Sequence, residues 1–312
     1  MKISELKSAL ADGILQKPEY IETAYNEIHS TLFDYSSNLR HTDIREISID
    51  SEGVVFTVRS SGIRIRCQQG DHRSPPFETF NFADFEPNES RMMHKLFEGY
   101  KTFYDIGANI GWHSLNLAGK YRDSTFYCFE PIPATYQHLQ ANIKLNSFTN
   151  IRTFNVALSD KNSRQDFFFY EKCSGNASAV NLTERNDVSA IECQQMRLDD
   201  FYNEEKLPLP DFIKCDVEGA ELMVFNGALS TLKSATPIVM AEILRKWSAK
   251  YKYNPNEILR IFNENGYRAF TTDGYFLIPF SEMTEETIET NFFFLHKIKH
   301  GEKIRRFEIK QS

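Results

Sequence analysis

The sequence lacks the features that mark several large classes of protein. It has no apolar run near the roughly 18 residues that a membrane-spanning helix requires. Glu5 and Asp12 interrupt the N-terminus, where a secretion signal would be apolar. The five cysteines are scattered and never spaced as CxxC, which favours reduced thiols over a disulfide framework or a zinc site. We therefore expect a cytoplasmic protein without a transmembrane segment.

An excess of positive charge is absent as well. The 36 lysines and arginines are outnumbered by 43 aspartates and glutamates, and the formal net charge is −7. Proteins whose main partner is a nucleic acid usually present a basic surface, so this balance argues against a nucleic acid partner. With 41% hydrophobic and 25% charged residues, the composition is that of an ordinary globular protein.

The N-terminal part of the chain changes its pattern twice. Residues 1–40 have an irregular amphipathic pattern that predicts helices. Over residues 44–67, apolar positions alternate with polar ones between turn sequences, which predicts a small antiparallel meander. Residues 68–87 are predicted to be a loop at a domain boundary. We therefore expect residues 1–87 to form an accessory unit on the substrate side of the protein.

From Lys101 onward the pattern alternates between strands and helices. Runs typical of buried strands end at Asp105, Glu130, Val156, Asp216 and Glu242. Two further strands are predicted near Tyr267–Thr271 and Asn291–His296, and the loop between them favours antiparallel pairing. We expect an α/β domain over residues 88–300, with a seven-stranded, mostly parallel sheet covered by helices on both faces. The stretch 301–312 is predicted to be a solvated basic tail.

The segment Phe103–Leu115, FYDIGANIGWHSL, predicts a strand that turns sharply into a helix and presents backbone N–H groups to a ligand. The dinucleotide pattern G-x-G-x-x-G would need glycine where Asn109 and Trp112 stand, and no Gly-Lys-Ser/Thr follows as in a P-loop. S-adenosylmethionine has no phosphate and fits this turn better. Glu130 suits its ribose, but that residue alone leaves NAD open, because NAD sites also place an acid there.

Further motifs follow this turn in a fixed order. The set is DIGANIG (Asp105–Gly111), FEP (Phe129–Pro131), ALSD (Ala157–Asp160), LDDF (Leu198–Phe201) and IKCDVEGAE (Ile213–Glu221). With this order and spacing, the chain resembles the FkbM-type family of S-adenosylmethionine-dependent methyltransferases from about Thr102 to Ala269. The resemblance implies the Rossmann-like fold of class I methyltransferases. It also implies O-methylation of a sugar hydroxyl in a glycan, a sugar nucleotide or a natural product.

The strand ends and the resemblance together predict the cofactor site. The residues expected at the turn are Asp105, Gly107, Ala108, Asn109 and Gly111. Asp105 is expected either to anchor the turn or to reach the methionine amine through water. Glu130 is expected at the ribose with Pro131 beside it, and the adenine is expected near Ala157, Leu158 and Ser159.

Methyl transfer to a hydroxyl needs groups that orient the oxygen and remove its proton. Asp216 is predicted to be this base, a ligand of a hard cation such as Mg²⁺, or a partner of the cofactor's positive end. Glu242 is a second candidate metal ligand. Glu218 is a further catalytic candidate, although an acid there also suits the first turn of a helix. His113 is a candidate base, with ordinary packing as the alternative.

The acceptor is expected to be a small molecule or a glycan with a free hydroxyl. The small, polar segment Cys173–Asn181 is predicted to contribute to its binding loop. A homo-oligomer is compatible with the sequence. The alternatives are a module that binds the cofactor without transferring the methyl group, a methyltransferase for a non-sugar hydroxyl, and an NAD-dependent enzyme.

Overall fold

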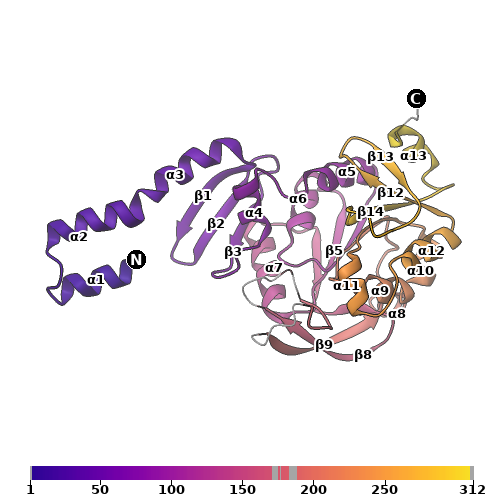
Figure 1. Ribbon diagram of the computed structural model, residues 1–312. Coiled ribbons are helices and arrows are strands. Elements are labelled where there is room, and N and C mark those ends of the chain that lie inside the picture. Colours follow the sequence, from indigo (N-terminus) through magenta and orange to yellow (C-terminus); the bar gives the residue numbers. More distant parts are fainter. Residues whose placement is uncertain (1, 171–174, 176, 183–187, 310–312) are drawn as a thin grey trace.

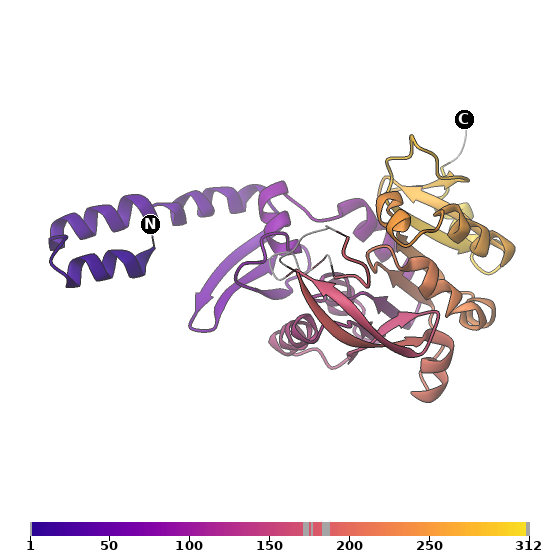
Figure 2. The ribbon, with the colours of Figure 1, turned by 60° about the horizontal axis from the view of Figure 1, so that its bottom comes forward.

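The computed structural model describes residues 2–170, 175, 177–182 and 188–309 (Figure 1). These residues form a large body of sheet and helices, from which an N-terminal helical arm projects (Figures 1 and 2). None of the helices in the described part of the chain combines the length and the apolar character needed to cross a membrane.

Within the described residues, the main sheet has eight strands in the order β13-β12-β14-β11-β10-β4-β5-β6. Strands β11, β10, β4, β5 and β6 pair in parallel, whereas β14, β12 and β13 pair antiparallel. The chain runs outward from β4 to β6 and later returns to β10, so the switch point lies between β4 and β10. The strands are β4 (Thr102–Ile106), β5 (Thr125–Phe129), β6 (Ile151–Phe154), β10 (Phe212–Cys215), β11 (Ile238–Glu242), β12 (Tyr267–Thr272), β13 (Leu277–Phe280) and β14 (Asn291–His296).

The Rossmann-like fold expected from the sequence is confirmed, but the predicted number of strands is wrong, because the sheet has eight rather than seven. The additional strand, β13, lies in the segment predicted to be a loop and pairs with β12 as a hairpin. It is a four-residue edge strand that contains Pro279. Such a strand lacks the long alternating pattern on which strand prediction depends.

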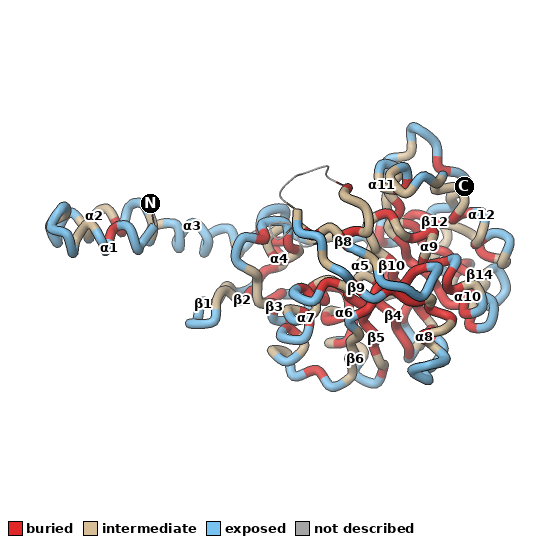
Figure 3. The backbone as a smooth tube through the Cα atoms, turned by 90° about the horizontal axis from the view of Figure 1, so that it is seen from below, coloured by how far each residue is buried: buried red, intermediate tan, exposed pale blue. Residues whose placement is uncertain are grey.

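Helices cover both faces of this sheet, as predicted. Because neighbouring residues of a strand point to opposite faces, Phe103 and Tyr104 pack into different hydrophobic clusters. Tyr104 lies on the side of α9 and α12, and Phe103 lies on the side of α5 and α13. Figure 3 shows the buried strands between these layers. The helices are α5 (Pro87–Phe97), α6 (Trp112–Lys120), α7 (Pro133–Leu145), α8 (Leu198–Glu204), α9 (Glu221–Asn226), α10 (Leu229–Ala235), α11 (Arg245–Lys250), α12 (Asn256–Glu264) and α13 (Gly301–Phe307).

The prediction of a solvated tail over residues 301–312 is wrong for the described part of that stretch. Helix α13 packs on the body through the buried side chain of Ile304. Glu308 forms an ion pair with Arg268 of β12. The basic residues dominate the sequence pattern here, whereas Ile304, Phe307 and the ion pair of Glu308 hold the helix on the body.

A second, three-stranded sheet lies between β6 and β10 in the sequence. Its order is β7-β9-β8, with β7 (Ala157–Ser159), β8 (Ser163–Phe169) and β9 (Ser189–Arg197). Strands β8 and β9 form a long antiparallel hairpin at the bottom of the body in Figure 1, which comes forward in Figure 2. The segment between β6 and α8, which we call the β7–β9 insertion, therefore has a sheet of its own.

The N-terminal helices and meander are confirmed. They comprise α1 (Ile3–Ala11), α2 (Lys17–Ala24), a π-helical turn (Tyr25–His29), α3 (Thr31–Asn38) and the strands β1 (Ile44–Asp50), β2 (Gly53–Val58) and β3 (Arg64–Cys67). The predicted loop over residues 68–87 is partly wrong, because it contains helix α4 (Pro75–Phe82). Pro75 and Pro76 look like loop signals, but proline also suits the first turn of a helix.

The meander packs directly against the body. The backbone N–H groups of Arg64 and Arg66 on β3 donate to the side-chain oxygens of Asn146 and Asn142 at 2.8 Å and 2.9 Å. Trp112, at the start of α6, is buried in the same hydrophobic cluster as residues of the meander. The predicted domain boundary near residue 87 stays a prediction.

Candidate functional site

A cavity of about 830 Å³ lies at the carboxyl ends of β4, β5, β10 and β11. Its wall includes most of the residues proposed from the sequence: Gly107, Ala108, Asn109, His113, Glu130, Pro131, Ala157, Leu158, Ser159, Asp216, Glu218 and Glu242. Asp105 and Gly111 are not among the described residues that line the cavity. The sheet therefore brings the predicted cofactor residues and the predicted catalytic residues to one site, as parallel sheets do at a switch point.

The glycine turn is shaped by contacts within the chain. Gly107 has a φ of +77°, and a Cβ atom built there would lie 1.8 Å from the carbonyl oxygen of Asp216. Gly111 has a φ of +91°, and a Cβ atom there would lie 2.6 Å from Leu139 Cδ1. The sequence argument gave glycine two uses in this turn, a positive φ and the close approach of a ligand to the backbone. In the structure both glycines have a positive φ, and Gly107 is also needed because the backbone of Asp216 lies against it.

Glu130 supports the turn from the neighbouring strand. One of its carboxylate oxygens accepts a hydrogen bond from the Asn109 N–H at 3.0 Å, and the other accepts one from the Ile132 N–H at 2.9 Å. Burial raises the pKa of Glu130 to about 7, and these two hydrogen bonds oppose the rise. Its predicted contact with a ribose stays a prediction. The side chain lines the cavity.

Asp105 lies behind the turn. Its carboxylate accepts a hydrogen bond from the Ser114 hydroxyl at 2.6 Å and lies 3.6 Å from the Lys214 ammonium group. The side chain is almost fully buried. This position matches an anchor of the turn, one of the two roles expected for Asp105.

Sequence reasoning missed Lys214, which is buried in the middle of β10. Its ammonium group donates to the Gly107 carbonyl at 3.1 Å and to Asp216 Oδ2 at 3.1 Å. Burial alone would lower the pKa of Lys214, but the carboxylates of Asp216 and Asp105 outweigh it and raise this pKa. A lysine inside an apolar parallel strand needs a buried partner of opposite charge. The presence of Lys214 in such a strand was therefore a signal in the sequence for a buried ion pair.

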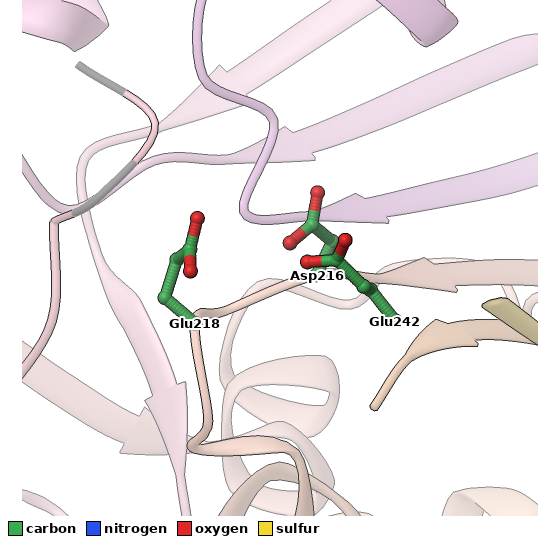
Figure 4. A group of neighbouring side chains, drawn as sticks. All are labelled: Asp216, Glu218 and Glu242. Carbon is green, nitrogen blue, oxygen red and sulfur yellow. The ribbon is translucent and has the colours of Figure 1, made fainter. Parts of the chain in front are cut away.

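Asp216, Glu218 and Glu242 converge at the other end of the cavity (Figure 4). Each offers a carboxylate oxygen, and these oxygens all lie within 4.8 Å of one another. Burial raises the pKa values of Glu218 and Glu242 well above their usual range, and repulsion by Asp216 adds to the rise. Grouped carboxylate oxygens are the donors that Mg²⁺ and Ca²⁺ prefer, so this cluster fits a hard divalent cation.

The alternative explanation of Glu218 as a helix-stabilising acid is wrong. Helix α9 begins at Glu221, and Glu218 precedes it with a positive φ of 54°. Glu221 provides the local support instead, because its Oε1 accepts hydrogen bonds from the N–H groups of Val217 and Gly219. Glu218 therefore points into the cavity from a loop rather than from a helix.

His113 lies on the same cavity wall and is 8% exposed. Its Nε2 atom lies 3.0 Å from a carboxylate oxygen of Glu86, which directly precedes α5. Sequence reasoning missed Glu86, because it falls in the segment predicted to be a loop at a domain boundary. No local pattern indicates that this segment reaches the site.

The β7–β9 insertion covers part of the cavity. Ser178 donates to the Glu218 carbonyl at 3.0 Å, and its hydroxyl lies 2.7 Å from the Tyr251 hydroxyl. Ala177, Ala179 and Val180 line the cavity. The predicted acceptor loop, Cys173–Asn181, is thus at the cavity in its described part, while residues 173, 174 and 176 lie outside the described residues.

The sheet order, the glycine turn and the acid after the second strand define a class I, Rossmann-like methyltransferase domain. Residues 105–269, more than half of the chain, match the model of the methyltransferase FkbM domain. The chain belongs to this family of S-adenosylmethionine-dependent methyltransferases.

Individual relatives are more distant. The 2-O-methyltransferase NoeI of Sinorhizobium fredii is 31% identical over 142 residues, which cover 41% of this chain and 57% of NoeI. The hexuronic acid methyltransferase AglP of Haloferax volcanii is 25% identical over 156 residues, which cover 50% of this chain and 61% of AglP. A crystal structure of an FkbM methyltransferase from Methylobacillus flagellatus has a TM-score of 0.42 and 14% identity, covering 86% of this chain and 60% of that one. The chain thus spans less than two thirds of each relative.

Proposed function

We propose that this protein is an S-adenosylmethionine-dependent O-methyltransferase that acts on a hydroxyl of a sugar in a glycan, a sugar nucleotide or a natural product. The observation that carries the proposal is the single cavity, which joins the glycine turn to the carboxylate cluster of Asp216, Glu218 and Glu242. The names of the two curated relatives, a 2-O-methyltransferase and a hexuronic acid methyltransferase, favour a hydroxyl on a carbohydrate.

The turn end of the cavity is assigned to the cofactor. When bound, S-adenosylmethionine supplies an electrophilic methyl group on a positively charged sulfur. Gly107, Ala108 and Asn109 would face its amino-acid part, Glu130 with Pro131 its ribose, and Ala157, Leu158 and Ser159 its adenine. Asp105 and Gly111 act from behind by fixing the turn.

The acid end is assigned to the acceptor. Asp216 is held by Lys214 and keeps a carboxylate next to the site of transfer. With Glu218 and Glu242 it would hold a Mg²⁺ ion, which would help a bound hydroxyl to lose its proton. The covering segment Ala177–Val180 helps to exclude water, so that the acceptor hydroxyl is held in line with the methyl group.

The test is transfer of a labelled methyl group to a panel of free sugars, hexuronic acids, sugar nucleotides and glycans, with mass spectrometry to locate the new methyl ether. Each reaction is run with Mg²⁺ and with a chelator. We expect methylation of a carbohydrate hydroxyl that depends on Mg²⁺. Methylation only of non-sugar hydroxyls would overturn the substrate assignment, and tight cofactor binding without any transfer would favour a cofactor-binding scaffold.

A further inference from the structure

Two side chains at the acid end are not used in the proposed function above, the candidate base His113 and its neighbour Glu86. Glu86 lies on the segment that joins the N-terminal unit to the methyltransferase domain, and His113 lies in the first turn of α6, just after the glycine turn. Their side chains meet at 3.0 Å, and both line the cavity. The pair therefore brings together a residue from outside the family match and a residue from within it.

The backbone at Glu86 is unusual for this residue type. Glu86 precedes α5 with φ and ψ of 45° and 53°, in the left-handed region that glycine and asparagine favour. Its side chain makes no capping hydrogen bond to the helix and reaches His113 instead. Residues held in such conformations gather at functional sites, where the surrounding structure maintains them.

The contact places a carboxylate oxygen of Glu86 beside one nitrogen of the imidazole. A neutral histidine carries one N–H, and the carboxylate of Glu86 favours placing it on Nε2. Among the described residues, none forms a hydrogen bond with Nδ1 of His113. Nδ1 is also not one of the side-chain atoms that are fully buried without a partner. Nδ1 is therefore the ring atom with a free lone pair, on a side chain that lines the cavity.

The carboxylates of the cluster already have other partners in this account, the cation and Lys214. Asp216 forms an ion pair with Lys214, with 3.1 Å between the ammonium nitrogen and Oδ2. Burial raises the pKa of Glu242, and the charges of Asp216, Glu218 and Glu86 add to that rise. Glu86 is therefore close enough to the cluster to act on it. The acids are therefore assigned to a cation, and His113 is the imidazole on the same cavity wall.

We propose that His113 is the catalytic base of the methyl transfer and that Glu86 is its positioning residue; this rests on the proposed function. His113 Nδ1 takes the proton of the acceptor hydroxyl while the oxygen bonds to the methyl carbon and the carbon–sulfur bond breaks, its electron pair staying on sulfur. Glu86 holds the ring in the required tautomer and stabilises the imidazolium that forms, as a carboxylate does for a catalytic histidine.

The kinetic test uses the full chain with His113→Asn, Glu86→Gln and the matched control Glu98→Gln, which makes the same change at the exposed far end of α5. His113→Asn is expected to lower kcat by about 10²- to 10⁴-fold, with little change in the KM for S-adenosylmethionine. Glu86→Gln is expected to lower kcat less, and Glu98→Gln to leave it unchanged. Unchanged kcat in His113→Asn would overturn the assignment of the base.

A second measurement does not depend on activity. Nitrogen NMR of protein labelled at its eight histidines reports the tautomer of each ring, and His113→Asn identifies the signal. We expect His113 as the neutral Nε2–H tautomer, with that preference lost in Glu86→Leu. An Nδ1–H tautomer in the wild type would overturn the proposed roles of His113 and Glu86 even if methyl transfer is found. The correct tautomer without any methyl transfer would place the failure in the proposed function instead.

Discussion

The two ends of the cavity are built in different ways. At the turn end, the N–H groups of Gly107 and Ala108 donate to the Phe129 carbonyl at 3.0 Å, and the Asn109 N–H donates to Glu130. Backbone geometry on two neighbouring strands therefore sets this end. The acid end is assembled from side chains that are far apart in the sequence and are held by the balance of their charges: Glu86, His113, Asp216, Glu218 and Glu242. The turn end depends on close packing of the backbone, whereas the acid end depends on the balance of charges.

Lys214 connects the two ends, so its removal is expected to have the largest effect. Lys214→Met leaves Asp105 and Asp216 without their cation and frees the Gly107 carbonyl. We expect a loss of about 3–5 kcal/mol in the free energy of unfolding, the usual cost of breaking a buried ion pair. Urea denaturation measures it. Lys233→Met, an exposed lysine on α10, is the control, and equal losses in both variants would disprove the connecting role of Lys214.

The dependence of the turn end on space is tested by Gly107→Ala. The added Cβ would meet the Asp216 carbonyl oxygen at 1.8 Å. We expect a loss of roughly 2–4 kcal/mol in the free energy of unfolding, together with loss of S-adenosylmethionine binding in calorimetry. The control is Gly62→Ala, because Gly62 has a similar φ of +73° but no atom within 4 Å of the added Cβ. If both variants lose the same stability, the strain of a positive φ alone explains why glycine is needed at residue 107, and the collision with Asp216 is unimportant.

The buried acid of the turn end predicts a dependence of stability on pH. Burial raises the pKa of Glu130 from 4.5 to about 7, so the folded protein binds a proton that the unfolded chain has released. The stabilisation is complete below pH 4.5 and is lost as the pH rises through about 7. Comparison of the wild type with Glu130→Gln should reveal about 1–3 kcal/mol of this pH-dependent term. Parallel curves for the two proteins between pH 4.5 and 7 would contradict it.

The smallest effect on stability is expected at the acid end. Burial and the neighbouring carboxylates raise the pKa of Glu242, so its ionised form is unfavourable in the folded protein. Glu242→Gln is expected to change the free energy of unfolding by at most about 1 kcal/mol, in the stabilising direction, while weakening Mg²⁺ binding and methyl transfer. Thermal unfolding and Mg²⁺ calorimetry measure the two effects. The exposed Glu205→Gln is the control. A clear destabilisation without loss of Mg²⁺ binding would refute the proposed role of Glu242.

The same contrast explains which features could be predicted from the sequence. The turn and its neighbouring strand are contiguous segments with strong patterns, so the fold, the glycine turn and the position of Glu130 follow from the sequence. The carboxyl ends of parallel strands must meet, which is why Asp216 and Glu242 were predicted to lie together.

Other features depend on contacts between distant segments. Trp112 counted against a dinucleotide turn, but its packing against the meander could not be foreseen from its spacing. Glu86 reaches the site only because α5 and α6 place it beside His113. Helix α4 and strand β13 are short, and their prolines are also typical of loops, so their sequences alone do not distinguish them from loops.

A crystal structure with S-adenosylhomocysteine bound is the most direct test of the division of the cavity. The ribose hydroxyls are expected at Glu130 and the amino-acid part at Gly107–Asn109. The sulfur is then expected to face the cluster of Asp216, Glu218 and Glu242, with His113 beside the open space in front of it. A ligand whose sulfur points away from the carboxylates, or whose ribose lies far from Glu130, would contradict the assignment of both ends.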